Sequence, residues 1–400
     1  MITPAEAEAA IRAKVILLES ESRPLAGLAM AVLREPIAAS RDQPPFDRVT
    51  MDGIAFASAS GRRELRIAGT QAAGSRQRVL ASQDACFEVM TGAVVPTGCD
   101  CVIPVERITI QDGVATLQPD VVASQWQNIH RRGIDCRAGT PLLEPGTRLG
   151  APEVAVIAAA GLAHAQVSRE PRIMVISTGD ELIEPGEPVT DWQIYRSNAF
   201  AVLATLRRHG YTQLAQDHLP DDLATLRTRL RAHLDTHDVL ILSGGVSMGK
   251  YDYVPQVLAE LGIATVFHNV AQRPGKPMWF GVGAGTSTVY ALPGNPVSTL
   301  VCLRRYVLPG LAAAMGVTPA GDDTVAHPIA LDETFEVKPA LTLFAPVRVV
   351  TDAAGQRQAR LHFTQGSGDF TSLLHTDGFV ELPAGPAVVS RGSLVPLYRW

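Results

Sequence analysis

Four short segments of this chain place glycines, acids or cations where a predicted strand ends. In the first segment, Ser177 to Glu181, a glycine stands beside Asp180 and Glu181 directly after an apolar run. That combination suits a contact with a hydroxyl group or a metal ion. The alternative is a turn whose two acids are simply solvated.

The second segment runs from Leu242 to Asp252 and contains Gly244, Gly245 and Gly249. Glycines let a backbone approach a ligand closely, and successive free N–H groups can hold a phosphate. The segment lacks the Gly-Lys-Ser/Thr ending of a Walker loop and is not a Gly-x-Gly-x-x-Gly motif followed by an acid. A tight strand-to-helix turn is the alternative, although three glycines exceed what a turn needs.

The third segment is a proline-stiffened turn, Gln272 to Pro277, that carries Arg273 and Lys276 three residues apart. Arginine offers a planar fork of donors and lysine a point charge, so the pair suits a small oxyanion. An exposed basic turn is the alternative.

The fourth segment places Pro293, Asn295 and Pro296 between a predicted strand and a predicted helix. N–H groups at the start of a helix favour an anion. The alternative is ordinary capping of the helix by Asn295.

Two isolated carboxylates, Asp221 and Asp252, each follow a strand or the glycine segment and stand near a helix start. Two carboxylates with phosphate oxygens and water form a typical magnesium site. We therefore predict both as Mg²⁺ ligands, with N-capping as the alternative for each.

The elements that must position these segments follow from the hydrophobic pattern between about residues 172 and 316. Short apolar runs alternate there with helical patterns, which predicts a parallel sheet wrapped by helices. The predicted strands are Ile173–Ser177, Val239–Leu242, Thr265–Val270 and Val289–Leu292. The predicted helices begin at Ser197, at Asp221 or Asp222, at Val254 and at about Val297. Ligands bind at the carboxyl ends of the strands in such sheets, where the four segments stand.

The flanking regions show a different pattern. Thr3-Pro4-Ala5-Glu6 predicts a capped helix start. Residues 46–127 contain short apolar runs separated by turns, which predicts a β-rich unit. From about Thr324 the helical period vanishes, and the pattern predicts a small β-barrel or sandwich.

Composition excludes several classes of protein. Of the 400 residues, 46% are hydrophobic and 19% charged, which excludes a disordered chain. A net charge of −5 disfavours a general binder of nucleic acid or of anionic membranes. Five cysteines without a Cys-x-x-Cys pair argue against disulfides and zinc and favour a reducing cytoplasm. Glu6 and Glu8 stand where a signal peptide needs apolar residues, and the apolar stretch Ala151–Val167 is too interrupted to span a bilayer.

Taken together, these segments resemble the MoeA family of molybdopterin molybdenumtransferases, which includes the E domain of gephyrin and its plant counterpart. Further motifs match in the same order along nearly the whole chain, and their joint spacing is highly specific. They are Phe46–Gly53, Met90–Ala93 with Val95-Pro96-x-Gly98 and Glu106, Asn128–Asp135, and a looser Gly366-Ser367-Gly368-Asp369.

The resemblance implies a multidomain α/β plus β fold. Residues 1–45 and 128–168 would form an elongated, discontinuous N-terminal domain, with a β-rich domain inserted at 46–127. A molybdopterin-binding α/β domain would span 169–318, and a C-terminal β-domain would span 324–400. The resemblance also implies a homodimer whose active site is shared between subunits.

The implied reaction converts adenylylated molybdopterin and molybdate to molybdenum cofactor and AMP, with Mg²⁺. Electrostatic positioning, without a covalent protein nucleophile, is expected to drive it. The catalytic residues would be Asp221, Asp252, Lys276, Arg273 and Glu181. The substrate-binding residues would be Asp52, Thr91, Asp135, Asp180, Gly244, Gly245, Ser247, Pro293, Asn295, Pro296, Ser298 and Ser367.

The chain departs from the family pattern near the predicted oxyanion site. Asn269 stands where many members carry a lysine, and no Gly-Arg pair is visible around Pro339–Leu343.

The resemblance also implies a transient contact with a molybdopterin adenylyltransferase or with later cofactor enzymes.

Three other functions are alternatives to this one. The first is a molybdopterin adenylyltransferase, which would need only residues 170–316. The others are a non-catalytic scaffold and a nucleotide-binding regulator. The long flanking regions argue against the first, and the lack of a linker longer than about 20 residues argues against the scaffold.

Overall fold

The computed structural model describes residues 1–245, 253–318, 322 and 324–400. The chain divides into two compact units. The large unit comprises Met1–Glu35, Pro145–Val154 and His164–Trp400, and the small unit comprises Pro36–Glu144 and Ala155–Ala163.

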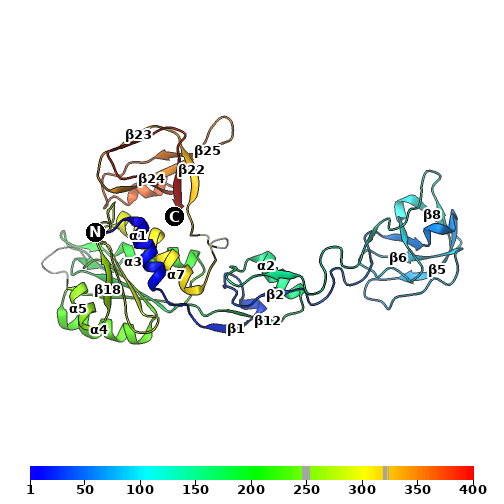
Figure 1. The fold of residues 1–400 in the computed structure, drawn as a ribbon, viewed down its shortest axis with the longest axis horizontal. Coiled ribbons are helices and arrows are strands. Elements are labelled where there is room, and N and C mark those ends of the chain that lie inside the picture. The colour runs from blue at the N-terminus through cyan, green and yellow to red at the C-terminus, as the bar shows by residue number, and fades with distance from the viewer. Residues whose placement is uncertain (246–252, 319–321, 323) are drawn as a thin grey trace. The chain divides into compact units, whose positions relative to one another are not determined.

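A sheet covered by helices lies at the centre of the large unit (Figure 1). It has six strands in the order β16-β13-β17-β21-β20-β18. Its strands are β13 (Ile173–Thr178), β16 (Leu214–Leu219), β17 (Val239–Ser243), β18 (Ala264–His268), β20 (Trp279–Val282) and β21 (Thr288–Leu292). The first four strands in this order are parallel, as predicted.

The prediction of a parallel sheet is wrong for one strand, because β20 runs antiparallel to both of its neighbours, β21 and β18. Only residues 269–278 connect β18 to β20, and a parallel pair needs a crossover of about a dozen residues or more. The sequence patterns also missed β16 and β20. β16 carries Gln216, Asp217 and His218, so it does not present a continuous apolar run.

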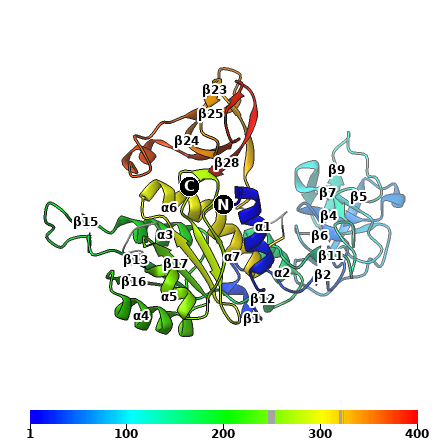
Figure 2. The ribbon, with the colours of Figure 1, turned by 60° about the vertical axis from the view of Figure 1, so that its left-hand side comes forward.

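Helices cover both faces of this sheet, as Figure 2 shows. One face packs on α1 (Pro4–Lys14), α3 (Ser197–Arg208) and α7 (Leu308–Met315) through a core that includes Ile241. The other face packs on α4 (Leu223–Thr236) and α5 (Val254–Glu260) through a core that includes Leu240 and Leu242. Alternate side chains of β17 thus pack into the cores on opposite faces of the sheet.

Two predicted helix starts are confirmed. Thr3 and Glu6 form the reciprocal capping box at the start of α1, with the Thr3 N–H donating to the Glu6 carboxylate at 2.7 Å. Asp222 caps α4, accepting from the Thr225 N–H at 2.8 Å.

A long helical run follows β21. It comprises α6 (Pro296–Cys302), the π-helical turn η4 (Leu303–Val307) and α7. Among the described residues, this run from Pro296 to Met315 is long and apolar enough to cross a membrane, but 89% of it is buried inside the protein. A core helix of a folded domain has the same properties.

The C-terminal region is a closed barrel, so of the two predicted forms it is the barrel that is present. The ring runs β24-β25-β22-β28-β26 and closes by pairing of β26 with β24. The elements are β22 (His327–Leu331), β23 (Phe335–Val337), β24 (Thr342–Thr351), β25 (Arg357–Leu361), η6 (Thr371–His375), β26 (Gly378–Leu382), β27 (Ala387–Val389) and β28 (Leu394–Arg399). The short strand β19 (Gln272–Arg273) pairs with β24. This pairing joins the turn Gln272–Pro277, here called the basic turn, to the barrel.

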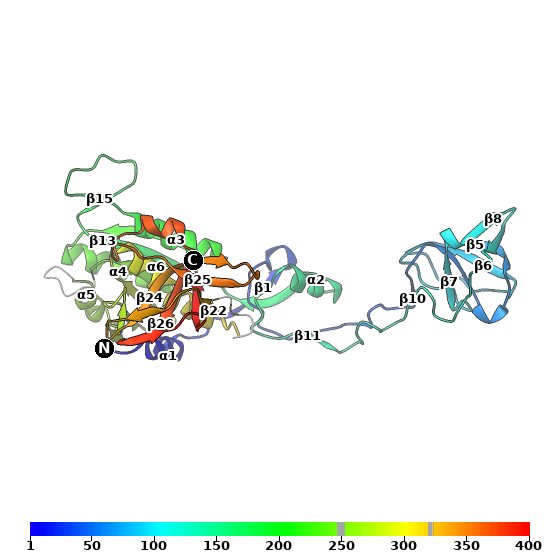
Figure 3. The same cartoon turned by 90° about the horizontal axis from the view of Figure 1, so that it is seen from above.

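The remaining elements of the large unit are short. Strand β1 (Ser20–Pro24) pairs with β12 (His164–Ser168), and η1 spans Leu25–Gly27. Strand β14 (Leu182–Ile183) pairs with β15 (Ile194–Tyr195) in a segment that extends away from the α/β sheet in Figures 2 and 3.

The small unit is β-rich, as predicted, with a six-stranded sheet in the order β7-β4-β6-β5-β9-β8 (Figure 3). Its elements are β4 (Gly53–Phe56), η2 (Ser58–Ser60), β5 (Glu64–Gln71), β6 (Ala85–Val89), β7 (Cys101–Pro104), η3 (Val105–Arg107), β8 (Ile108–Gln111) and β9 (Val114–Leu117). Strand β2 (Ile37–Ala38) pairs with β11 (Pro141–Leu143), and β3 (Arg48–Val49) with β10 (Ile129–His130). Helix α2 spans Ala151–Ala159.

Candidate active site

The strand register brings the ends of the four parallel strands to one edge of the sheet. Thr178 at the end of β13 lies beside Leu219 at the end of β16. Ser243 at the end of β17 lies between Ser177 and Leu292. The segments that follow these strands therefore begin side by side, as the sequence predicted.

The acidic segments after β13 and β16 touch directly. The backbone N–H of Asp221 donates to the Asp180 carboxylate at 3.2 Å. Asp180 and Glu181 are exposed, and Asp221 is half-buried. Asp180 also lines a polar cavity of about 520 Å³ that includes Glu184 and Asp217. This edge of the sheet is rich in carboxylate oxygens.

Gly244 and Gly245 begin the loop after β17, and neither position accepts a side chain. Both have positive φ, at 100° and 66°. A Cβ at Gly244 would lie 2.7 Å from the Thr178 carbonyl oxygen, and one at Gly245 would lie 2.8 Å from a Val254 methyl group. The glycines are therefore required by close packing as well as by backbone conformation. Packing and conformation therefore explain these two glycines without a bound ligand. This agrees with the alternative that the segment is a tight strand-to-helix turn.

Two hydroxyl groups at the same edge lack partners. The side-chain oxygens of Ser177 and Thr178 are buried and accept or donate no hydrogen bond within the described part of the chain. A buried polar atom without a partner is costly, and a bound water, ion or ligand group is one explanation for it. The Thr178 oxygen lies close to both Gly244 and Gly245, which makes the start of this loop a candidate binding position.

The fully buried side chain of Gln272 holds the basic turn in place. Its Nε2 donates to the Pro274 carbonyl at 3.0 Å, and its Oε1 accepts from the Tyr306 hydroxyl. A Cβ at Gly275 would come within 2.7 Å of the Cys302 sulfur. The turn is thus packed tightly on α6 and η4, while Arg273 and Lys276 stay exposed.

A cleft of about 640 Å³, here called the basic cleft, opens between this turn, the start of α6 and the barrel. Its lining residues are Gln272, Arg273, Pro274, Gly275, Lys276, Pro277, Pro293, Asn295, Val297, Ser298, Pro339, Leu341, Leu343, Phe344, Ala345, Pro346, His362, Phe363, Thr364, Gly366 and Ser367. None of these described residues is an acid. Neither Arg273 nor Lys276 forms an ion pair with another residue that the structure describes, so their charge faces the cleft uncompensated.

The barrel contributes to the start of α6. Asn295 Nδ2 donates to Ser367 Oγ at 2.8 Å, and the Val297 N–H donates to the Ser367 carbonyl at 3.0 Å. The side chain of Asn295 therefore does not cap the helix, contrary to the simple capping alternative. The Val297 N–H, expected to face an anion, is used by Ser367 instead.

The glycine loop and the basic cleft adjoin. A Cβ at Gly294 would lie 3.6 Å from the Gly244 Cα. Asn198 from α3 joins the two strand ends, because its Nδ2 donates to the Ser243 hydroxyl at 3.1 Å and to the Gly294 carbonyl at 2.7 Å.

Three predicted site residues lie in the small unit. The Asp52 carboxylate accepts from the Thr91 N–H at 2.6 Å and from the Thr91 hydroxyl at 2.7 Å. These two hydrogen bonds lower the pKa of Asp52. Asp135 Oδ1 lies 2.9 Å from His130 Nε2, and His130 Nδ1 lies 3.1 Å from the Arg48 guanidinium. Asp52 and Thr91 are thus one polar pair, and Asp135 belongs to a separate one.

The structure brings most of the predicted residues of the large unit to two adjoining places. Arg273, Lys276, Pro293, Asn295, Ser298 and Ser367 line the basic cleft, and Asp180, Glu181, Asp221, Gly244 and Gly245 follow the strand ends. Pro296 begins α6. Ser247 and Asp252 lie outside the described residues.

Several residues of the site escaped sequence reasoning. Ser177 and Thr178 were noted only as part of a motif, and Asn198, Gln272 and His362 gave no signal of their own. Asn198 stands one residue after a predicted helix start, and Gln272 opens the basic turn, so their positions beside known segments were the available clue.

Carboxylates and hydroxyls at the strand ends fit a magnesium ion by their chemistry, since Mg²⁺ takes oxygen ligands and usually only one or two protein carboxylates. No group of three or more His, Cys, Asp or Glu side chains able to hold a metal occurs within the described residues. The fit therefore rests on Asp180, Asp221 and the unpartnered Thr178 hydroxyl.

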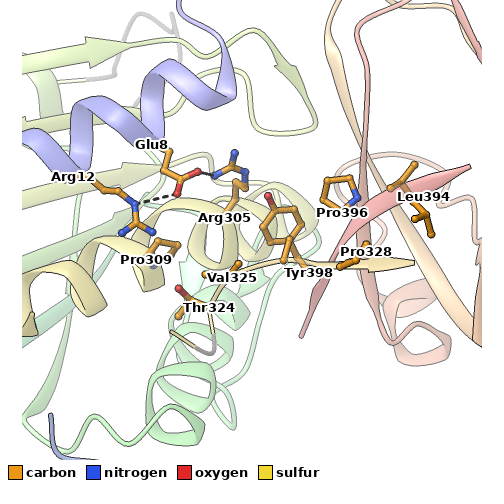
Figure 4. A pocket seen from close by; sticks show the side chains of 12 residues that line it. Glu8, Arg12, Arg305, Pro309, Thr324, Val325, Pro328, Leu394, Pro396 and Tyr398 are labelled. Carbon is orange, nitrogen blue, oxygen red and sulfur yellow. Dashed lines mark hydrogen bonds and ion pairs between the residues drawn. The ribbon is translucent and has the colours of Figure 1, made fainter. Parts of the chain in front are cut away.

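A second cavity, of about 360 Å³, lies between α1, η4 and the barrel (Figure 4). Arg305, only 6% exposed, crosses it and binds Glu8 at 2.5 Å and Glu381 at 3.1 Å. Burial opposes charging of Arg305, but Tyr398 and the two carboxylates raise its pKa. Because these charges are already compensated among themselves, we interpret this cavity as a structural junction.

Comparison with known proteins gives consistent matches along the chain. Residues 2–161 match the family model of the MoeA N-terminal region (domain I and II). Residues 174–313 match a probable molybdopterin binding domain, and residues 329–400 match the MoeA C-terminal region (domain IV).

Individual relatives agree with these models. A molybdopterin molybdenumtransferase from Synechocystis is 39% identical over 374 residues, which cover 92% of each chain. One from Haemophilus influenzae is 31% identical, covering 92% of this chain and 90% of its own. The crystal structure of a molybdopterin biosynthesis MoeA protein from Pyrococcus horikoshii superposes with a TM-score of 0.80 at 27% identity, covering 100% of this chain and 99% of that one.

Proposed function

Because this chain belongs to the molybdopterin molybdenumtransferase family, we propose that it converts adenylylated molybdopterin and molybdate to molybdenum cofactor and AMP with the help of Mg²⁺. The observation that carries the proposal is the basic cleft. Its described lining holds Arg273, Lys276 and several hydroxyl groups but no carboxylate, which suits a small dianion.

Molybdate binds in the basic cleft under this proposal. Arg273 and Lys276 supply fixed charge, and Ser298 and Ser367 supply hydroxyl donors. Because Gln272 and Gly275 hold the turn rigidly, the two cations need little reorganisation when the anion arrives.

The phosphates of the substrate bind at the start of the glycine loop. Gly244 and Gly245 carry no side chain, and the buried hydroxyls of Ser177 and Thr178, without a hydrogen-bond partner among the described residues, offer donors there. Since Gly294 adjoins Gly244, a pterin attached to these phosphates would reach the basic cleft. Glu181, after β13, and Asn295, at the start of α6, remain proposed contacts of the substrate.

Magnesium would be held by Asp221, which Asp180 contacts, and by Asp252, which lies outside the described residues. When bound, the ion supplies charge neutralisation and polarisation of the phosphoanhydride. The Asp180 carboxylate fixes the Asp221 backbone through its 3.2 Å hydrogen bond, so it acts as a positioning group for this acidic edge.

We further propose a homodimer in which the small unit of one subunit completes the site of the other with Asp52, Thr91 and Asp135. Asp52 and Thr91 are both exposed, and their chain neighbours Met51 and Met90 are 42% and 49% exposed. Large apolar side chains around a polar pair favour a covered surface over a solvated one.

The four-part domain division at 1–45 with 128–168, 46–127, 169–318 and 324–400 is retained in this proposal. So are a cytoplasmic reaction and a transient contact with a molybdopterin adenylyltransferase that hands over the substrate. Neither nucleic acid nor membrane is a proposed partner.

The test is incubation of the full chain with adenylylated molybdopterin, Mg²⁺ and molybdate. Molybdate-dependent release of AMP, with reconstitution of an apo-molybdoenzyme, is the expected result. Consumption of ATP and molybdopterin without any need for molybdate would instead identify an adenylyltransferase. Binding of nucleotide without turnover would identify a regulator or a scaffold.

A further inference from the structure

One side chain of the basic cleft belongs to no predicted motif. His362 stands directly after β25 and lines the cleft together with Arg273, Lys276 and Ser367. It is half-buried, and its backbone N–H donates to the Pro346 carbonyl at 2.8 Å, which fixes its place on the barrel. Its imidazole makes no hydrogen bond with any other residue that the structure describes.

We propose that His362 is a third anion-binding group of this cleft, which binds molybdate in its protonated form and makes molybdate affinity depend on pH. This inference rests on the proposed function. The barrel wall of the cleft is otherwise apolar where Leu341, Leu343 and Phe363 line it. A dianion held between that wall and the basic turn would therefore meet only one ionisable group on the barrel side.

The charges around His362 permit this role. It lines the same cleft as Arg273 and Lys276 of the basic turn, and from η6 the ring of His375 approaches with a centroid distance of 6.3 Å. The nearby acids are engaged elsewhere. Asp369 is bound by Gln365, Thr371 and Ser372, and Asp377 accepts from the Val349 N–H at 2.7 Å.

On the same strand, Arg360 pairs with Asp332 at 2.6 Å. A bound dianion favours the charged form of a neighbouring imidazole. Binding of molybdate and uptake of a proton by His362 are therefore linked, and histidine is the side chain that changes charge in the physiological range.

The experiment measures equilibrium binding of molybdate alone to the full chain at about pH 6 and about pH 8, a range in which His changes charge. In the unmodified chain, affinity should fall about tenfold on going to the higher pH, as expected for loss of one charge-assisted hydrogen bond. His362→Gln should bind weakly at both values. His362→Lys should bind well at both, because its charge is permanent there.

His327→Gln is the matched control, since His327 is an exposed histidine of the same barrel that does not line the cleft, and it should retain the pH dependence. Unfolding midpoints of all variants verify that each is folded, and the Lys variant keeps the test decisive if the Gln variant is destabilised. Equal pH dependence in the unmodified chain and in His362→Gln would overturn the inference, as would absence of molybdate binding.

AMP release is followed in parallel to separate this inference from the proposed function. If molybdate binding depends on pH and on His362 but no AMP is released, the proposed reaction is wrong and the inference about His362 holds. If AMP is released but replacing His362 does not change the affinity for molybdate, the reaction is supported and the inference is wrong. A change confined to the affinity for adenylylated molybdopterin would also overturn the inference, because it would place His362 on the other substrate.

Discussion

Asn295 at the start of α6 donates a hydrogen bond to Ser367 of the barrel at 2.8 Å, and the Ser367 carbonyl accepts from Val297 at 3.0 Å. These contacts fix the barrel loop to the α/β domain at the rim of the basic cleft. They explain how a loosely patterned Gly-Ser-Gly-Asp segment about 70 residues downstream becomes part of the site.

The first prediction tests this contact with a double-mutant cycle. Asn295→Ala and Ser367→Ala should each lower the free energy of unfolding by about 0.5–1.5 kcal/mol, the net value of one hydrogen bond. The double variant should lose no more than about one of the singles, because both remove the same bond. Urea unfolding of the full chain measures all four proteins, and strictly additive losses would mean that the bond is absent.

The second prediction concerns the basic turn. Lys276→Ala should raise the molybdate concentration needed for half-maximal AMP release about ten- to a hundredfold, the cost of one charge-assisted contact of ~1.5–3 kcal/mol. The effect should weaken at high salt, because exposed charges are screened over about 8 Å at physiological ionic strength. Lys338→Ala, an exposed lysine next to the cleft but not lining it, is the control.

If Lys276→Ala instead abolished binding of adenylylated molybdopterin and left the molybdate dependence unchanged, the turn would be a phosphate or pterin clamp. The oxyanion site would then lie elsewhere on the protein.

The third prediction concerns the glycine loop. Gly244→Ala should destabilise the chain and weaken nucleotide binding, because its Cβ would lie 2.7 Å from the Thr178 carbonyl and its φ is 100°. Gly262→Ala separates the two effects, since Gly262 has a φ of 85° but open space around it. The control should lose only the ~1–2 kcal/mol of the left-handed conformation. Equal losses for the two variants, read from unfolding midpoints, would contradict tight packing at Gly244.

The sequence predicted the edge of the sheet well because its signals are local. An apolar run followed by glycines or acids needs no knowledge of distant residues, and the ends of β13, β17 and β21 follow from such runs. The reversed strand β20, antiparallel to both β18 and β21, was not predictable in this way. Its direction depends on the length of the connection and on the fact that the basic turn is used to reach the barrel.

Side-chain partnerships across domains were also beyond the sequence. Asn295 looked like a helix cap and proved to bind Ser367, and His362 acquires significance only because the barrel closes beside the basic turn. Asn269 looked like a missing lysine of the anion site. It adopts a φ of 70°, a conformation that asparagine tolerates better than lysine, and it does not line the basic cleft.

The fourth prediction concerns Glu8 and acid pH. Burial opposes ionisation of Glu8, but Arg305 and Arg12 lower its pKa overall. A carboxyl whose pKa is lower in the folded state contributes stability above its unfolded pKa and loses that contribution as pH falls through the folded pKa. The stability advantage of the unmodified chain over Glu8→Gln should therefore shrink from neutral pH toward acid.

Thermal unfolding at several pH values measures this advantage, and Glu333→Gln, an exposed barrel carboxylate, serves as the control. A constant difference between the unmodified chain and Glu8→Gln over the whole range would show that the Glu8–Arg305 pair at 2.5 Å does not stabilise the fold through charge.

The last prediction tests the shared active site. Asp52 lies in the small unit, bound to Thr91, whereas Asp221 lies at the sheet edge of the large unit, bound to Asp180. Asp52→Ala and Asp221→Ala should each inactivate the enzyme, since each removes a carboxylate that the proposed site uses. In a mixed dimer with one variant per subunit, one site combines both defects and the other combines neither, provided that Asp52 acts on the partner's site. Each heterodimer should then have about one functional site in two, the symmetry result for a two-fold dimer. Co-expression with two different affinity tags isolates the heterodimer, and AMP release measures its activity. A confirmed heterodimer without activity would place Asp52 and Asp221 in the same subunit's site.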